Sequence, residues 1–244
     1  MAIKNYFNFD RKNQKKLRGK TLNNANWELL RDNKIEMQFG FEKTKEEYIK
    51  NIKKKKDYRK KASIIARILK KSNVKTVISM GCGKGILEYY LKKLLPDITI
   101  VCTDYTKEAI KTLEKYSNCD RFEVFDMLKG DYSQFGKDTC LIFHRVEPEL
   151  DLKQWKNIFK EIYKNQGLKI IFIPSTVMTV KDIFAYFYKR IRNASHYKQA
   201  ISCGWLYTGL EIEYFLTNSW KCKKAIERKI AIEHSYIYEI DISK

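Results

Sequence analysis

Short apolar runs alternate with amphipathic segments through the middle of the chain. The runs are predicted to be buried strands, whereas apolar residues that recur every three or four positions predict helices. Strands alternating with helices of about ten residues favour a parallel sheet wound on both faces. The expected strands are 76–80, 99–102, 121–125, 138–143 and 168–173, and the expected helices among them are 86–95, 107–116 and 152–163.

The segment before the first strand carries a helical pattern. Apolar residues Tyr58, Ala62, Ile65 and Leu69 fall on one face of a helix in 44–71. The run Lys53-Lys54-Lys55-Lys56 predicts either a break between two helices or one exposed turn. Residues 1–42 are polar and basic but hold several large apolar side chains, so a partly helical arm is expected there.

After Pro174 the pattern changes. Val180, Ile183, Phe184 and Phe187 predict a strongly amphipathic helix inside an insertion that packs over the mouth of the site. The expected insertion is 175–207, the expected helix after it is 210–216, and the expected terminal hairpin is 225–232 with 236–242.

A glycine-rich turn follows the first predicted strand. Gly81, Gly83 and Gly85 alternate there, a helix opens directly after them, and Asp104 lies just after the second expected strand. Glycines permit a tight turn and close backbone approach to a ligand, the helix start offers free N–H groups, and an acid at this place can hold ribose hydroxyls. The order of elements indicates a nucleotide-cradling unit; the alternative is a crossover whose glycines only close the turn.

The chain resembles the class I S-adenosylmethionine (SAM)-dependent methyltransferases of the small-molecule type. Their first motif, acid-x-Gly-x-Gly-x-Gly, is matched by the three glycines, but Ser79 stands at the position of the acid. In dehydrogenases the last glycine comes one residue later, so the spacing fits that class less well. The resemblance implies a doubly wound, mostly parallel seven-stranded α/β sheet with a C-terminal hairpin. The expected units are a basic helical N-terminal arm or lid, 1–73, and a SAM-binding domain, 74–244, which contains the helical insertion at about 175–207.

The resemblance also implies residues that hold the cofactor. The glycine turn faces the methionine and ribose parts, Asp104 accepts from the ribose hydroxyls, and Asp126 accepts from the adenine amino group. The alternatives are that Asp104 caps the following helix and that Asp126 is an ordinary loop residue. The expected cofactor-binding residues are Arg59, Ser79, Met80, Gly81, Cys82, Gly83, Gly85, Asp104, Tyr105, Asp126 and Met127.

The end of the fourth strand carries the candidates for chemistry. His144 is the expected general base because imidazole titrates near neutral pH. Glu147 is expected to orient His144 or bind an amine, and Arg145 to bind an anionic acceptor. His144 could equally be a half-buried structural histidine, and an acceptor that is already an anion needs no base. Tyr48 and Tyr58 are expected to line the acceptor pocket, although most aromatic residues of this kind belong to a core.

Two classes of nucleic-acid enzyme are disfavoured by missing motifs. Methyltransferases of exocyclic base amines typically carry Asp/Asn-Pro-Pro-aromatic after the fourth strand, whereas this chain reads His-Arg-Val-Glu-Pro-Glu. A Pro-Cys pair, needed for attack on a base carbon, is also absent from the sequence. The six cysteines show no C-x-x-C spacing and the three histidines no metal spacing, so no metal site is expected.

The positive net charge of the chain is consistent with a polyanionic partner. The formal net charge is +20, and residues 1–73 hold 22 Lys/Arg against 8 Asp/Glu. Such a field attracts phosphates or nucleic acid, although codon bias can also enrich lysine. No signal-peptide or membrane-spanning pattern is found, and unpaired cysteines favour a cytoplasmic protein.

Three functions remain open from the sequence. The first is SAM-dependent methyl transfer to O or N of a small anionic metabolite, phosphorylated, nucleotide-linked or sugar-linked, such as a precursor of a surface polysaccharide. The second is an RNA or DNA methyltransferase that uses the basic arm. The third is a SAM-binding protein without catalysis.

Overall fold

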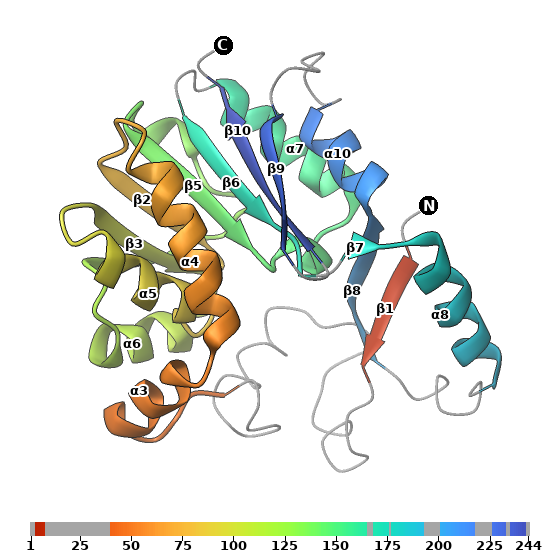
Figure 1. The fold of residues 1–244 in the computed structure, drawn as a ribbon, viewed down its shortest axis with the longest axis horizontal. Helices are drawn as coiled ribbons and strands as arrows, with labels where there is room; N and C mark the ends of the chain where they lie inside the picture. Colours follow the sequence, from red (N-terminus) through yellow and green to blue (C-terminus); the bar gives the residue numbers. More distant parts are fainter. Residues whose placement is uncertain are drawn as a thin grey trace.

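A computed structural model describes residues 3–7, 40–164, 168–175, 177–192, 201–217, 226–232 and 235–242. Its main sheet has seven strands in the order β4-β3-β2-β5-β6-β10-β9 (Figure 1). The first five of these are parallel to one another, and β10 runs antiparallel to both β6 and β9. Their bounds are β2 Thr76–Met80, β3 Thr99–Asp104, β4 Arg121–Val124, β5 Thr139–His144, β6 Lys169–Ile173, β9 Ile226–Ile232 and β10 Ser235–Asp241.

Helices cover both faces of this sheet. One face packs against α4 (Lys56–Leu69), α5 (Ile86–Leu94) and α6 (Lys107–Tyr116), and the other against α7 (Leu152–Lys164) and α10 (Gly209–Thr217). The central strands are apolar on both sides, as strands buried between two helical layers must be.

Neighbouring residues of each strand belong to opposite layers. Val77 packs in the cluster with α4 and α5, whereas Ile78 packs in the cluster with α7 and α10. Trp155 and Phe159 of α7 and Phe215 of α10 fill the second cluster with stacked and tilted aromatic contacts. The carboxyl ends of the parallel strands β2 and β5 lie at the same edge of this sheet, where an α/β sheet can present a site.

Two helices, α3 (Lys45–Lys53) and α4, precede β2 and are called the α3–α4 bracket below. Helix α3 is capped by Thr44, whose side chain accepts from the Glu47 amide, and α4 begins after Lys55. The predicted helical region 44–71 is therefore two helices, with the break in the lysine run. Figure 1 shows α3 below α4 and beside α6.

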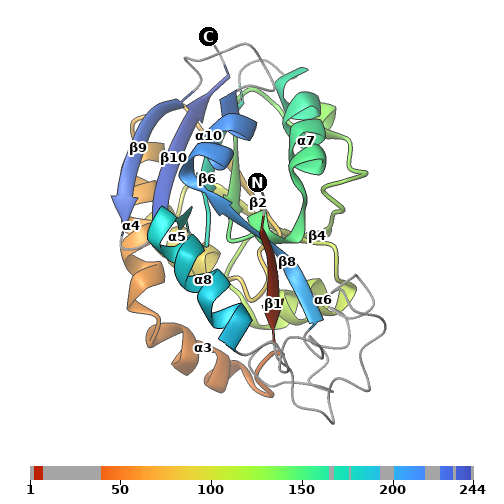
Figure 2. The same cartoon turned by 90° about the vertical axis from the view of Figure 1, so that its right-hand side faces the viewer.

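A second, three-stranded sheet lies beside the main one (Figures 1 and 2). Its strands are β1 (Ile3–Phe7), β8 (Ile201–Thr208) and β7 (Val177–Met178), and helix α8 (Val180–Arg192) follows β7. The 3-10 helices η1 (Tyr132–Gln134) and η2 (Glu147–Glu149) complete the described elements.

The predicted doubly wound sheet and antiparallel C-terminal hairpin are confirmed. The helix predicted in the insertion is α8, but β1 and β8 are strands that the sequence patterns did not predict. The expected helical character of the arm falls largely on residues 8–39, outside the described residues. None of the described helices is long and apolar enough to cross a membrane.

A candidate cofactor pocket at the glycine turn

The turn between β2 and α5 depends on its glycines. Gly81, Gly83 and Gly85 all have positive φ angles, 67°, 56° and 63°. Side chains disfavour this left-handed backbone, and a Cβ atom at position 81 would lie 2.7 Å from Cγ1 of Val146. Three glycines therefore let the chain leave β2 and enter α5 within a few residues.

Asp104 fastens this turn to the end of β3. The backbone N–H of Gly83 donates to Oδ2 of Asp104 at 3.1 Å. The other oxygen, Oδ1, accepts from the Thr106 backbone N–H at 2.9 Å and from its hydroxyl at 2.6 Å. The buried carboxylate thus joins the glycine turn to Thr106, the residue before α6, and caps no amide of that helix.

Helix α3 closes over the same turn. The hydroxyl of Tyr48 donates to the Lys84 carbonyl at 2.9 Å, and the Lys84 ammonium lies 3.4 Å from Glu42. Asn51 donates to the same Glu42 oxygen at 3.2 Å. Tyr48 is fully buried, so its ring is a structural brace of the turn as well as part of the pocket wall.

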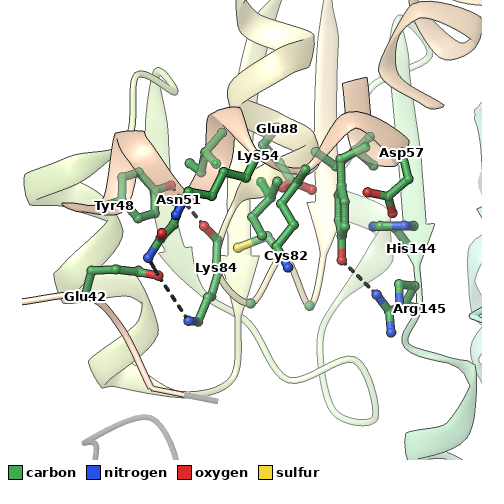
Figure 3. A pocket seen from close by; sticks show the side chains of 17 residues that line it. Glu42, Tyr48, Asn51, Lys54, Asp57, Cys82, Lys84, Glu88, His144 and Arg145 are labelled. Atoms are coloured by element: carbon green, nitrogen blue, oxygen red, sulfur yellow. Dashed lines mark hydrogen bonds and ion pairs between the residues drawn. The ribbon is translucent and has the colours of Figure 1, made fainter. Parts of the chain in front are cut away.

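These elements enclose a pocket of about 810 Å³. That volume lies within the usual range for small-molecule and cofactor sites. Figure 3 shows side chains from the α3–α4 bracket, the glycine turn and the end of β5 converging on it. Its charged and polar lining consists of Glu42, Tyr48, Asn51, Lys54, Lys55, Asp57, Tyr58, Cys82, Lys84, Glu88, His144 and Arg145.

A buried acid lies under the turn. Glu88, on the first turn of α5, is 1% exposed and its carboxylate accepts from the Ser79 hydroxyl. Burial raises the pKa of Glu88 to about 7, and the Ser79 hydrogen bond opposes that rise. The first turn of α5 therefore places a carboxylate beside Ser79.

His144 and Arg145 enter the pocket from the end of β5. The His144 and Tyr58 rings pack edge-to-face, with their ring centroids 5.2 Å apart. The Nε2 atom of His144 is buried without a hydrogen-bond partner among the described residues. Burial, with smaller contributions from Lys61 and Arg145, holds the pKa of His144 well below its ordinary value. His144 is therefore neutral near pH 7.

Arg145 has an unusual backbone. Its φ of 60° makes it the single non-glycine residue with a positive φ among those described. Its guanidinium donates to the Tyr58 hydroxyl at 2.9 Å, and its backbone N–H to the Ile173 carbonyl at 2.8 Å. Strain of this kind gathers at functional sites, because the surrounding structure has to hold it.

Comparison with known proteins fits this geometry. Residues 54–139 match the family model described as Methyltransferase small domain. Magnesium protoporphyrin IX methyltransferase from Synechocystis PCC 6803, with bound SAM, superposes with a TM-score of 0.55 over 92% of this chain and 100% of that one, at 13% identity. Human N-acetylserotonin methyltransferase in complex with SAM gives 0.52 over 81% and 56%, at 14% identity. Likeness at such identity establishes the fold.

Residues 54–139 thus match a methyltransferase family, and the chain has the fold of SAM-dependent methyltransferases. The predicted enzyme class agrees with this family match, and the two solved structures named above contain SAM, the predicted cofactor.

Two curated relatives share part of the methyltransferase sequence. Ribosomal RNA large subunit methyltransferase G of Shewanella woodyi is 30% identical over 93 residues, which are 37% of this chain and 22% of that protein. Ribosomal RNA small subunit methyltransferase C of Buchnera aphidicola subsp. Baizongia pistaciae is 29% identical over 134 residues, 51% of this chain and 41% of that protein. The chain thus spans less than half the length of these relatives.

The remaining predicted site residues are distributed around the methyltransferase pocket. Met127 lies close to the turn, since a Cβ at position 81 would be 3.8 Å from its Cε atom. Asp126 accepts from the Leu128 amide at 2.9 Å. Met80 is buried in the core, and Arg59 is exposed on α4. Half-buried Tyr105 follows Asp104; none of these five residues lines the enclosed pocket.

Glu147 is not among the residues that line the pocket with His144. Its carboxylate accepts from the Ser175 backbone N–H at 2.6 Å and from the Ser175 hydroxyl, and its carbonyl accepts from Trp155 Nε1 at 3.1 Å. Burial raises the pKa of Glu147 to about 7. These contacts tie the loop after β5 to the loop after β6, so the structure gives Glu147 a bracing position.

Sequence reasoning missed Glu88 and the polar residues of the α3–α4 bracket. Glu88 occupies the inward side of α5 beside Leu87 and Leu91, where an acid is expensive unless paired. That conflict was the available signal. Among the described residues, no group of three or more histidine, cysteine, aspartate or glutamate side chains is arranged to hold a metal ion.

Proposed function

We propose that this methyltransferase transfers the methyl group of SAM to RNA. The observation that carries the proposal is the charge around the pocket. Residues 43–71, which include α3 and α4, hold 13 Lys/Arg against 3 Asp/Glu, and most of these basic side chains are exposed. Lys54 and Lys55 belong both to this basic surface and to the pocket lining. A basic surface continuous with a site favours a polyanionic substrate.

The curated relatives support the same acceptor. Both are named as ribosomal RNA methyltransferases. Because the shared segments are a minority of those proteins, their acceptor is a proposal for this chain.

The residues at the turn fit SAM. The pocket is large enough, the glycine turn admits close backbone approach, and Asp104 presents a buried acid at the neighbouring strand end. SAM supplies an activated methyl group when bound. The chain's own residues have to hold donor and acceptor in line and keep water out.

Two residues at the end of β5 suit the acceptor side. Arg145 places a guanidinium at the pocket and can pair with a phosphate. His144, neutral through burial, retains one ring nitrogen that can accept a proton from the acceptor. Its low pKa makes it a weak base, which suits an acceptor that loses its proton readily.

A small anionic metabolite is the second candidate, favoured by one observation. The segment after β5 lacks the Pro-Pro-aromatic sequence typical of enzymes that methylate base amines. Arg145 and a pocket of this volume would serve a phosphorylated small molecule equally well.

Tritium transfer from methyl-labelled SAM separates the two acceptors. Purified protein is incubated with deproteinised total RNA or with a panel of phosphorylated metabolites. We expect tritium to appear in RNA and to be released by ribonuclease. Activity should fall steeply between about 50 and 200 mM salt, because several contacts to phosphates make binding salt-dependent. Label only in small molecules, with weak salt dependence, would replace RNA by the second candidate.

A pair of charge variants sharpens this test. Lys56→Ala/Lys60→Ala removes two exposed charges from α4, near the pocket, and Lys153→Ala/Lys160→Ala removes two exposed charges from α7, on the opposite face. RNA binding should weaken, and its salt slope should shrink, only for the α4 pair. Equal effects from both pairs would mean that the polyanion is attracted by net charge and not held at the pocket.

A further inference from the structure

An acid buried beneath a ligand pocket needs a reason to be there. Glu88 is 1% exposed, yet its side chain belongs to the pocket lining (Figure 3). Among the described residues, its carboxylate accepts a hydrogen bond from the neutral hydroxyl of Ser79. Burying a carboxylate without a cation is costly, and neither a lysine nor an arginine contributes to its ionisation among the described residues.

The surroundings of Glu88 hold it in place without neutralising it. Ser79 reaches it from β2, Cys82 approaches from the glycine turn and Tyr48 from α3. Burial raises the pKa of Cys82 to about 11 and that of Tyr48 further above its ordinary value, so both are neutral near pH 7. The remaining ionisable groups of the pocket lining are Glu42, Lys54, Lys55, Asp57, Tyr58, Lys84, His144 and Arg145.

The ligand proposed for this pocket carries a compensating charge. SAM and its demethylated product both bear an ammonium group at the methionine end. The glycine turn that Glu88 underlies lines the pocket through Gly81, Cys82 and Gly83. An ammonium hydrogen-bonded to a buried carboxylate is among the stronger polar contacts that proteins make.

We propose that Glu88 receives the ammonium of the cofactor, with the Ser79 hydroxyl orienting its carboxylate. This inference rests on the proposed use of SAM. On this proposal, the acid that the family motif carries at the end of the first strand is supplied here by Glu88 of α5, and Ser79 and Glu88 act together.

The pH dependence follows from burial. Because the pKa of Glu88 is raised to about 7, its carboxyl is largely protonated at pH 6 and ionised at pH 8. An ammonium binds the ionised form, so affinity for an amine-bearing ligand should rise across this range.

A pair of ligands isolates the ammonium contact. S-adenosylhomocysteine carries the amino-acid portion, and 5′-methylthioadenosine lacks it. In calorimetric titrations at pH 8, Glu88→Gln should weaken binding of S-adenosylhomocysteine by about tenfold or more and leave that of 5′-methylthioadenosine within about twofold. The wild-type affinity for S-adenosylhomocysteine should increase from pH 6 to pH 8, and that of the variant should stay flat.

Two further variants protect the test from a folding artefact. Glu114→Gln changes an exposed acid on α6 and should bind both ligands as the wild type does. The exchange Ser79→Glu/Glu88→Ser returns the acid to the strand and should recover most of the tenfold loss. Thermal unfolding checks that each variant folds.

The outcomes distinguish this inference from the proposed function. If the wild type binds neither ligand, the use of SAM fails. If it binds both, and Glu88→Gln either changes nothing or weakens both ligands equally, the cofactor assignment stands and the ammonium contact is overturned.

Discussion

The two sheets of this methyltransferase are specified by the sequence in different ways. The parallel strands β2 to β6 follow one another along the chain, separated by helices that cover them. The small sheet instead joins β1, near the start of the chain, to β8, with Ile3 opposite Leu206. The main sheet can be predicted from the local periodicity of each strand and helix. The small sheet depends on pairing between distant segments, which local sequence patterns do not indicate.

The difference bears on the site. The glycine turn, Asp104 and His144 all stand at strand ends of the main sheet, where local pattern and tertiary structure agree. The small sheet meets the loop after β5, since a Cβ at Gly204 would lie 1.7 Å from the Pro148 carbonyl oxygen. The cofactor side of the pocket therefore belongs to the main sheet, and the small sheet adjoins its β5 end.

The largest expected effect is on the core of the main sheet. Trp155→Ala removes a fully buried indole packed on Phe215 and should lower the unfolding free energy by about 3–5 kcal/mol. Trp205→Ala in β8 removes a half-buried ring and should cost clearly less. Urea denaturation followed by circular dichroism measures both. Equal losses would mean that the two sheets unfold as one unit.

The glycine turn comes next. Gly81→Ala puts a side chain at a φ of 67° and against Val146. We expect a loss of about 1–2 kcal/mol in unfolding free energy, and S-adenosylhomocysteine binding weakened by more than about tenfold. Gly209→Ala, where a Cβ finds ordinary contact with Val177, is the control. An unchanged affinity in Gly81→Ala would remove the turn from the binding site.

The contribution of Glu147 to the unfolding free energy should depend on pH, with an effect of intermediate size. Burial raises its folded pKa to about 7 from the ordinary value of 4.5, so the folded state holds a proton that the unfolded state has released between these pH values. The contribution of Glu147 to stability is present below pH 4.5 and is lost as pH rises through 7, by up to about 1.4 kcal/mol per pH unit.

Glu147→Gln removes this contribution. Urea midpoints measured from pH 5 to pH 7.5 should therefore fall less steeply in the variant than in the wild type. Glu114→Gln, at an exposed site, should keep the wild-type slope. Parallel pH profiles for Glu147→Gln and the wild type would contradict the assigned burial of this carboxyl.

The smallest effect on global stability is expected in the small sheet. Gly204→Ala forces β8 away from Pro148, because the new Cβ would meet backbone atoms. Hydrogen exchange should show faster exchange of β8 amides, with a smaller loss of global unfolding free energy than Gly81→Ala and S-adenosylhomocysteine affinity unchanged. Gly136→Ala, beside the Asp138 side chain, is the control. A global loss of several kcal/mol would show that the small sheet supports the core.

Sequence reasoning reached the main sheet because each strand and helix carried its own signal. Helix 107–116 was predicted with the bounds of α6, and strand 76–80 with those of β2. It also singled out Gly81 and Asp104, whose turn chemistry is local. It could not find Glu88, because the partnership with Ser79 appears only when α5 folds back over β2. It predicted Glu147 beside His144, whereas the structure pairs Glu147 with Ser175 across two loops.

A crystal structure of the full chain with S-adenosylhomocysteine tests the central claim most directly. The account predicts the ligand in the pocket above Gly81 and Gly83, with its ammonium on Glu88 and its ribose at Asp104. A ligand bound elsewhere, or a pocket that stays empty at saturating concentration, would contradict it.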